Sequence, residues 1–99
     1  MNNMRPIHPG EILREEFLLT LGMTAHALAM AIRVPAPRIH DIVREKRSVS
    51  PDTALRLARY FSTTPEFWMN LQSAFDLRTA RLRTMDTIER EVSPRDVAA

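Results

Sequence analysis

Residues 24–43 read TAHALAMAIRVPAPRIHDIV, and this stretch decides the fold. Its apolar residues recur at helical spacing on both sides of a short break, and Ala29 lies where two crossing helices come closest. A small side chain at that place lets the second helix approach the first, and a branched residue after the turn fills the junction. The pattern predicts a helix-turn-helix, whose second helix can enter a DNA groove. An ordinary αα-hairpin in a small bundle would fit it as well. The apolar residues concerned are Leu28, Ile32, Val34, Ile39 and Ile42.

The charge distribution favours the DNA-binding interpretation. Residues 33–59 contain seven basic and three acidic residues, a net charge of +4, whereas residues 1–32 and 60–99 each carry −1. Positive charge is therefore concentrated on the second helix of the motif and on the segment after it, where a DNA backbone would lie. Thirteen of the fourteen basic residues are Arg, whose forked guanidinium suits phosphate and guanine better than Lys does. A solvated basic face without a partner is the alternative.

Length and composition limit the number of domains and the class of protein that the chain can form. A chain of 99 residues fits one domain with a modest core, and its 44% hydrophobic and 26% charged residues are typical of a soluble globular protein. The chain has no cysteine, and no apolar run has the length of a signal peptide or a membrane span. We therefore expect a cytoplasmic protein that associates with the nucleoid and has no membrane partner.

Helix start and stop signals divide the chain into about five helices. The first is expected over about residues 11–21, with an inward stripe of Ile12, Leu13, Phe17 and Leu21. Gly22 ends it. The next helices are expected over 25–32, from 36 to about 45, from 51 onward and from 65 onward. Their start signals are Thr24, Ser50 with Pro51, and Thr64 with Pro65. Residues 1–77 form the predicted DNA-binding domain, and residues 78–99 an extension that is partly helical with a frayed end.

The second helix of the motif carries the candidate DNA contacts. Once Ile39 and Ile42 are assigned to the core, Arg38 is the first candidate for a base-edge contact, because a bidentate Arg–guanine pair discriminates strongly between bases. His40 and Asp41 are weaker candidates, and each also fits a solvated surface residue. The residues after the helix supply groups that position the DNA backbone. The predicted DNA-binding set is Thr24, Ala36, Pro37, Arg38, His40, Asp41, Arg44, Lys46, Arg47 and Ser48.

Two prolines shape how this helix can hold phosphate. Pro35 and Pro37 have no backbone N–H, so the helix start offers fewer free donors than most helix N-termini. Side chains therefore have to bind the phosphates, and we expect a steep dependence of DNA binding on salt.

Four separate pieces of sequence resemble one family. They are HPGEIL at 8–13, the helix-turn-helix, DTALRLARYF at 52–61, and FWMNLQ with FDL at 67–77. Together they resemble the HigA/VapI antitoxins of the XRE helix-turn-helix class. The resemblance implies an all-α, compact five-helix domain similar to lambda repressor, with a short C-terminal helical extension. It further implies a dimer that binds an operator overlapping its own promoter and neutralises a HigB-type toxin, a RelE-like ribonuclease that cleaves messenger RNA on the ribosome.

One position departs from the pattern of this class. The turn commonly has glycine where this chain has Arg33. A left-handed conformation costs a non-glycine residue about 1 to 2 kcal/mol. We therefore expect the turn to avoid that conformation, the alternative being that stability is given up for a basic side chain beside the DNA.

The toxin and dimer surfaces are the least determined by the sequence. An acidic first helix could meet a basic ribonuclease, although acidic residues there also complement the helix dipole. The fifth helix and the tail of the chain are the expected dimer surface, because their apolar residues are isolated from the main core pattern. Truncation after Asp76 should leave a folded monomer with sharply weakened operator binding. Candidate toxin contacts are Glu11, Glu15 and Glu16, and candidate dimer contacts are Leu77, Met85 and Ile88.

Enzymatic functions fit the sequence poorly. The three histidines lack metal-ligand spacing, and two glycines are too few for a phosphate-binding loop. Glu15 and Glu16 are adjacent and so point to different sides of a helix. We expect no enzyme, metal or cofactor, histidines at the surface or half-buried, and Trp68 in the core. Two other functions stay open: a stand-alone regulator of phage-repressor type, and a helical module that binds an acidic protein.

Overall fold

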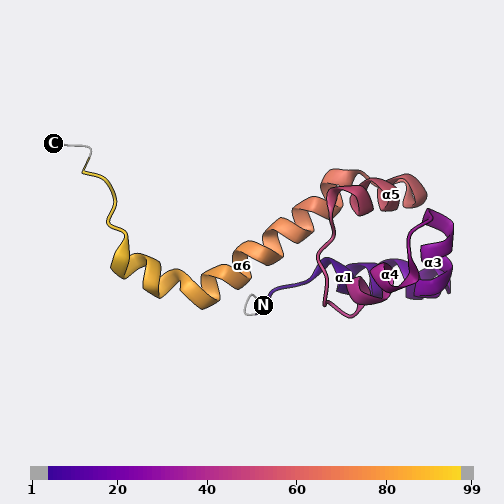
Figure 1. Ribbon diagram of the computed structural model, residues 1–99, viewed down its shortest axis with the longest axis horizontal. Coiled ribbons are helices and arrows are strands. Elements are labelled where there is room, and N and C mark those ends of the chain that lie inside the picture. The colour runs from indigo at the N-terminus through magenta and orange to yellow at the C-terminus, as the bar shows by residue number, and fades with distance from the viewer. Residues whose placement is uncertain (1–4, 97–99) are drawn as a thin grey trace.

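Helices make up all the regular secondary structure among the described residues. The computed structural model describes residues 5–96 and contains no β-strand in that range (Figure 1). Three consecutive segments form one continuous first helix, and four further helices follow, so the predicted all-α architecture of five helices is confirmed. The segments are α1 Pro9–Ile12, η1 Leu13–Leu18, α2 Leu19–Leu21, α3 Ala25–Ile32, α4 Ala36–Val43, α5 Pro51–Phe61 and α6 Pro65–Glu91.

The first helix begins earlier than predicted and is not α-helical throughout. His8 caps it, since its Nδ1 accepts a hydrogen bond from the Gly10 N–H at 2.8 Å. The helix then passes through a π-helical segment, in which the Leu19 N–H bonds to the Arg14 carbonyl five residues back. This wider turn shifts the later side chains around the axis. The predicted inward position of Leu21 was therefore wrong: Leu21 is 56% exposed, and Leu18 is buried.

Helices α3 and α4 cross as the apolar spacing predicted. Thr24 caps α3 by accepting the Ala27 N–H at 3.0 Å. Ala29 is 1% exposed at the crossing, and Ile39 and Ile42 of α4 are fully buried. The helix-turn-helix is thus built on a dry contact between two short helices, each of which is too short to be stable alone.

The expected conformation of the turn was wrong. Arg33 adopts the left-handed conformation, with φ of 61° and ψ of 51°. Its neighbour Val34 donates its N–H to the Ala29 carbonyl at 3.0 Å, which closes the end of α3 in the manner of a Schellman motif. Val34 is also buried against the core. These contacts offset the strain of a side chain in the left-handed region.

Aromatic packing joins α5 and α6 to the first helix. Trp68 is fully buried, as predicted, and its Nε1 donates to the Thr63 Oγ1 at 2.8 Å. The ring of Phe17 lies 5.1 Å from that of Trp68 and 4.8 Å from that of Phe61. The predicted caps of both helices are confirmed, since the hydroxyls of Ser50 and Thr64 accept first-turn N–H groups.

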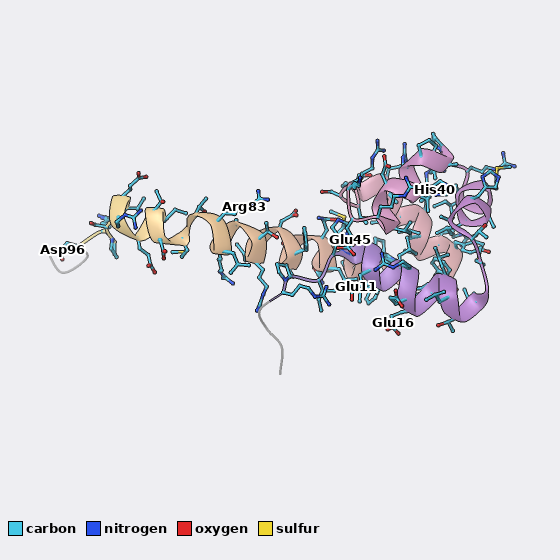
Figure 2. The ribbon with its side chains drawn as sticks, turned by 90° about the horizontal axis from the view of Figure 1, so that it is seen from below. Glu11, Glu16, His40, Glu45, Arg83 and Asp96 are labelled. Atoms are coloured by element: carbon cyan, nitrogen blue, oxygen red, sulfur yellow. The ribbon has the colours of Figure 1, made fainter. Side chains whose placement is uncertain are left out.

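Helix α6 continues far beyond the other helices. It is 27 residues long, and in Figure 1 it projects from them as a single rod. We call residues 9–79 the helical body and residues 80–91 the distal part of α6. Every residue of the distal part is exposed, and Figure 2 shows Arg83 on it and Asp96 beyond its end. The extension is therefore helical up to Glu91, and the domain boundary after residue 77 stays a prediction.

No helix within residues 5–96 combines the length and the apolar composition that a membrane span requires.

Candidate nucleic-acid interface

Helix α4 and the loop after it carry nearly all of the predicted DNA-binding residues. Pro37 is exposed at the start of α4, and the loop residues Arg44, Lys46, Arg47 and Ser48 are exposed after its end. Half-buried positions on α4 are Ala36, Arg38, His40 and Asp41. The structure thus brings this set together on one helix and its continuation. The remaining member, Thr24, is exposed at the start of α3, where its hydroxyl is already used as a cap.

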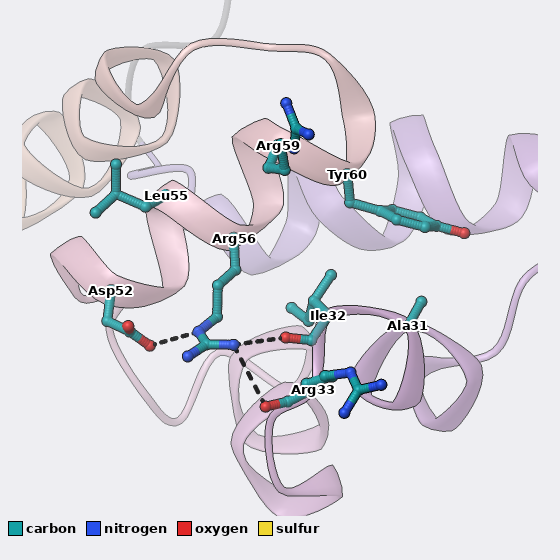
Figure 3. Close-up of a pocket in the computed structure, with 8 residues that line it drawn as sticks. All are labelled: Ala31, Ile32, Arg33, Asp52, Leu55, Arg56, Arg59 and Tyr60. Carbon is teal, nitrogen blue, oxygen red and sulfur yellow. Dashed lines mark hydrogen bonds and ion pairs between the residues drawn. The ribbon is translucent and has the colours of Figure 1, made fainter.

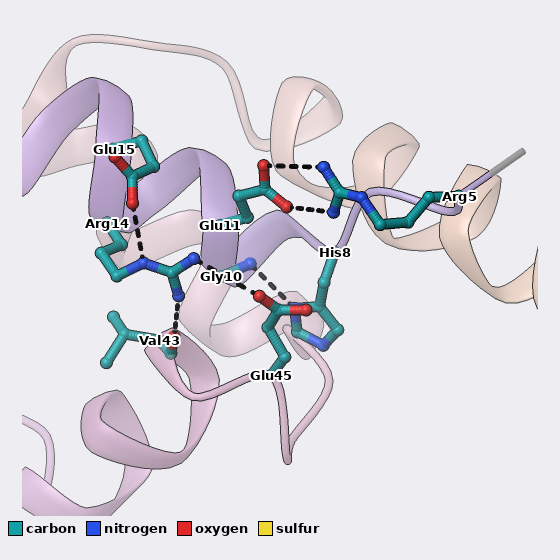
Figure 4. A network of polar contacts seen from close by, with 8 residues as sticks. All are labelled: Arg5, His8, Gly10, Glu11, Arg14, Glu15, Val43 and Glu45. Carbon is teal, nitrogen blue, oxygen red and sulfur yellow. Dashed lines mark hydrogen bonds and ion pairs between the residues drawn. The ribbon is translucent and has the colours of Figure 1, made fainter. Parts of the chain in front are cut away.

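The first helix holds the C-terminal end of α4. A Cβ atom at Gly10 would lie 1.8 Å from the Ile42 carbonyl oxygen, so the two backbones touch there and only glycine fits. One turn later, the Arg14 guanidinium donates to the Val43 carbonyl and, at 3.5 Å, to the Glu45 carboxylate (Figure 4). These bonds satisfy a carbonyl that a helix end leaves without a partner. Gly10 and Arg14 therefore fix where α4 lies.

His8 is part of the same contact and corrects the expectation of a surface or half-buried histidine. It is 3% exposed and its ring meets that of Phe75 edge-on, with 4.7 Å between the ring centroids. Burial lowers the pKa of His8, although the nearby carboxylates of Glu45 and Asp76 act in the opposite direction. The neutral imidazole is the form that can both be buried here and accept the Gly10 N–H.

Helix α5 holds the turn of the helix-turn-helix. The Arg56 Nη1 donates to the Ile32 carbonyl at 2.9 Å and lies 3.5 Å from that of Arg33 (Figure 3). Its Nε donates to the Asp52 Oδ2 at 3.0 Å, and the Arg38 Nη1 donates to the same oxygen at 3.1 Å. The hydrogen bond from Arg56, followed by its charge and the bond from Arg38, lowers the pKa of Asp52. Asp52 is therefore a carboxylate shared by two guanidiniums.

The loop after α4 is fixed at both ends. Glu45 is left-handed, with φ of 64°, and the next N–H, that of Lys46, bonds to the Asp41 carbonyl at 2.8 Å. At the far end, the Val49 N–H donates to the Gln72 Oε1 of α6 at 2.8 Å. The Gln72 Nε2 in turn donates to the Asp76 Oδ1 at 2.9 Å. The loop thus presents Lys46 and its neighbours from a defined backbone.

Comparison with known proteins identifies the family to which the chain belongs. Residues 13–68 match the helix-turn-helix family. The chain is 56% identical to virulence-associated protein I of Dichelobacter nodosus over 79 residues, which cover 80% of this chain and 73% of that protein. It belongs to the HigA/VapI antitoxin family. The structure of the Pseudomonas aeruginosa antitoxin HigA with the higBA promoter is similar, with a TM-score of 0.90 at 54% identity over 91% of this chain and 98% of that one. Antitoxin GraA in complex with its operator gives the same TM-score and identity, over 98% of each chain.

Two of the three candidate toxin contacts of this HigA/VapI-family chain are already paired. Glu11 accepts from the Arg5 guanidinium at 2.7 Å, which lowers the pKa of Glu11. Glu15 pairs with Arg14 at 3.0 Å. Among the described residues Glu16 has no ion pair, and Figure 2 shows it on the outer side of the first helix. Their part in toxin binding stays a prediction.

The three candidate dimer contacts of this HigA/VapI-family chain are all exposed. Leu77 is 52% exposed, Met85 37% and Ile88 42%. They lie on α6 at spacings that place them along one side of the helix, with Val92, also exposed, four residues further on. Their place in an interface stays a prediction, and so do the roles of the DNA-binding set.

Sequence reasoning missed four residues that position the interface: Gly10, Arg14, Asp52 and Gln72. Gly10 carried a local signal, because a glycine inside the first turn of a helix is unfavourable unless another backbone comes close. Arg14, Asp52 and Gln72 position the interface through bonds to residues 29, 14 and 23 positions away, which no local pattern marks.

Proposed function

We propose that this chain is the antitoxin of a HigB–HigA type II module. It binds its own operator as a dimer and represses its promoter, and it neutralises a RelE-like toxin that cleaves messenger RNA. The observation that carries the proposal is the set of three exposed cations Arg44, Lys46 and Arg47 in the loop that follows α4. Helix α4 is itself held by the first helix, through Gly10 and Arg14, and is bonded to α5 through Arg38 and Asp52. The family relatives bound to a promoter and an operator support DNA as the ligand.

The N-terminal half of α4 is proposed to read bases. Residues at the start of a recognition helix reach base edges in the major groove, and Arg38 is the third residue of α4. The α4–α5 loop is proposed to hold the phosphates through Arg44, Lys46, Arg47 and Ser48. Pro37 and the preceding Pro35 leave this helix start with few N–H donors, so side chains have to supply the phosphate contacts.

A dimer is proposed to make this contact specific. One recognition helix supplies few base contacts, whereas two related by a two-fold axis read half-sites about 34 Å apart, roughly one turn of DNA. The exposed side of α6 with Leu77, Met85 and Ile88 is the proposed dimer surface, because apolar side chains along an unpacked helix are the usual material of such contacts. The protein would then act on DNA in the cytoplasm, without catalysis of its own.

The toxin is proposed to dock on the first helix. Within residues 5–96, Glu16 is the carboxylate of the first helix without an ion pair, and the paired Glu11 and Glu15 could exchange their Arg partners for those of a basic ribonuclease. Substitution of Glu16 by Lys should weaken toxin binding while operator binding stays unchanged.

The test uses the gene next to the one encoding this chain. Its product should be toxic when expressed alone, should lose toxicity on co-expression, and should co-purify with this protein. Gel-shift titration on the upstream DNA should show a specific complex. Operator binding without any toxic neighbour would favour a stand-alone regulator of phage-repressor type, and no preference for the upstream DNA would overturn the proposal.

A further inference from the structure

One carboxylate outside the helix-turn-helix contacts the residue proposed to read bases. Asp52 is the second residue of α5, and its Oδ2 accepts from the Arg38 Nη1 at 3.1 Å. It is not on the recognition helix and cannot itself be an attractive contact to phosphate, because like charges repel. The bond to Arg38 is the direct link from Asp52 to the recognition helix.

The position of Asp52 is restricted by a second bond. Arg56, four residues later on the same helix, donates its Nε to the same Oδ2 at 3.0 Å. The guanidinium of Arg56 is anchored in turn by the Ile32 carbonyl at the end of α3. A planar guanidinium bound on two sides has little freedom, so it holds the carboxylate in one place. An unbroken series of bonds thus runs from the turn of the motif through Arg56 and Asp52 to Arg38. Figure 3 shows the part of it from Ile32 and Arg33 through Arg56 to Asp52.

Arg38 keeps donors for a second partner. A guanidinium has five N–H groups, and the bond to Asp52 occupies one of them on Nη1. The side chain of Arg38 is 30% exposed, so part of it remains accessible from solvent. A long side chain that is already held loses less conformational freedom when it binds a base edge, and it presents its fork in one orientation.

We infer that Asp52 is a positioning residue that orients Arg38 and thereby sets base specificity. The inference rests on the proposed function, because it requires that Arg38 reads a base. The negative charge of Asp52 also opposes attraction of the phosphate backbone, which is independent of sequence. Loss of this charge therefore lowers discrimination between bases without lowering affinity for DNA in general. A merely structural role would lower both.

The experiment selects binding sites from a DNA library with randomised positions, and uses the full chain. The base pair at which Arg38→Ala loses its preference marks the Arg38 contact. At that base pair Asp52→Asn should lose about tenfold in preference, within the range of one bidentate contact. Preferences at the other positions should stay unchanged, and affinity for random duplex should be equal or higher. The double variant should lose no more than Arg38→Ala alone.

Glu66→Gln is the matched control. It makes the same chemical change at an exposed first-turn position, on α6 and outside the interface, and should leave every preference as in the wild type. The inference is overturned if Asp52→Asn keeps the preference at the Arg38 base pair, if Asp52→Asn weakens all positions alike together with its thermal midpoint, or if Arg38→Ala loses preference nowhere. Wild-type protein without any base preference would instead overturn the proposed function, and this inference with it.

Discussion

The helical body and the distal part of α6 have the same secondary structure and opposite environments. In the body each helix buries a face, and Leu57 and Trp68 are fully shielded from solvent. In the distal part every residue is exposed, among them Leu82, which is 67% exposed. Isolated helices of about 12 to 15 residues are marginal in water. The body is therefore stabilised by its own core, whereas the distal part has apolar side chains available for a partner.

Core truncation should show the largest difference between the two regions. Trp68→Ala should destabilise the chain by about 3 to 5 kcal/mol, because a large side chain is removed from a filled site. Leu82→Ala should change the free energy of unfolding by less than about 0.5 kcal/mol, since the side chain is exposed. Urea denaturation at a concentration too low for association checks both. A large loss for Leu82→Ala would mean that the distal part packs within the single chain.

The contact between α1 and α4 should be nearly as sensitive. Gly10→Ala places a Cβ against the Ile42 carbonyl and should cost about 3 kcal/mol, at the upper end of overpacking effects. Gly22→Ala is the control. Gly22 has φ of 65° with open space around it. Gly22→Ala should therefore lower the free energy of unfolding only by the cost of a left-handed backbone, about 1 to 2 kcal/mol. Equal thermal midpoints for the two variants would contradict the close backbone contact.

Charge on the distal part should affect association and not folding. Ile88→Asp should keep the unfolding curve of the wild type at low concentration, shift sedimentation toward the monomer, and weaken operator binding at least about tenfold, some 1.4 kcal/mol. Thr87→Asp adds the same charge one position earlier, about 100° around the helix. It should leave both measurements unchanged. A dimeric Ile88→Asp protein would place the interface elsewhere on the chain.

The buried His8 should give the body a small dependence on pH. Its pKa is lowered in the folded chain, so below its ordinary value of about 6.5 the unfolded chain binds more protons. Stability is then fully present above that pH and decreases as the pH falls through it. The thermal midpoint should therefore drop between pH 7.5 and 5.5.

Two variants separate His8 from the exposed His26. His8→Asn keeps an oxygen that can cap the helix, and it should flatten the pH dependence at a lower overall midpoint. His26→Asn changes an exposed residue and should retain the drop. A drop of the same size in His8→Asn would exclude His8 as its source.

The features that the sequence predicted correctly are local ones. Thr24, Ser50 and Thr64 cap helices through atoms only three residues away, and Ala29 follows from helical spacing. The left-handed Arg33 was missed because the strain is offset in part by the burial of the next residue, Val34, in the core, which the local pattern does not show.

In the candidate interface, too, local features could be predicted from the sequence and contacts between distant segments could not. Its exposed cations could be listed from the sequence, because exposure and charge follow from the helix pattern. The bonds of Arg14 to Val43 and of Val49 to Gln72 join segments 29 and 23 residues apart. The π-helical turn that exposes Leu21 likewise has no mark in the residue pattern.

A salt titration of operator binding tests most directly that the body, through the loop after α4, holds the DNA backbone. The slope of log affinity against log salt should become shallower by about one unit in each of the single variants Arg44→Ala and Arg47→Ala, because each removes one phosphate contact. Arg90→Ala, which removes an exposed Arg near the end of α6, should leave the slope unchanged. Unchanged slopes in both loop variants would contradict the account.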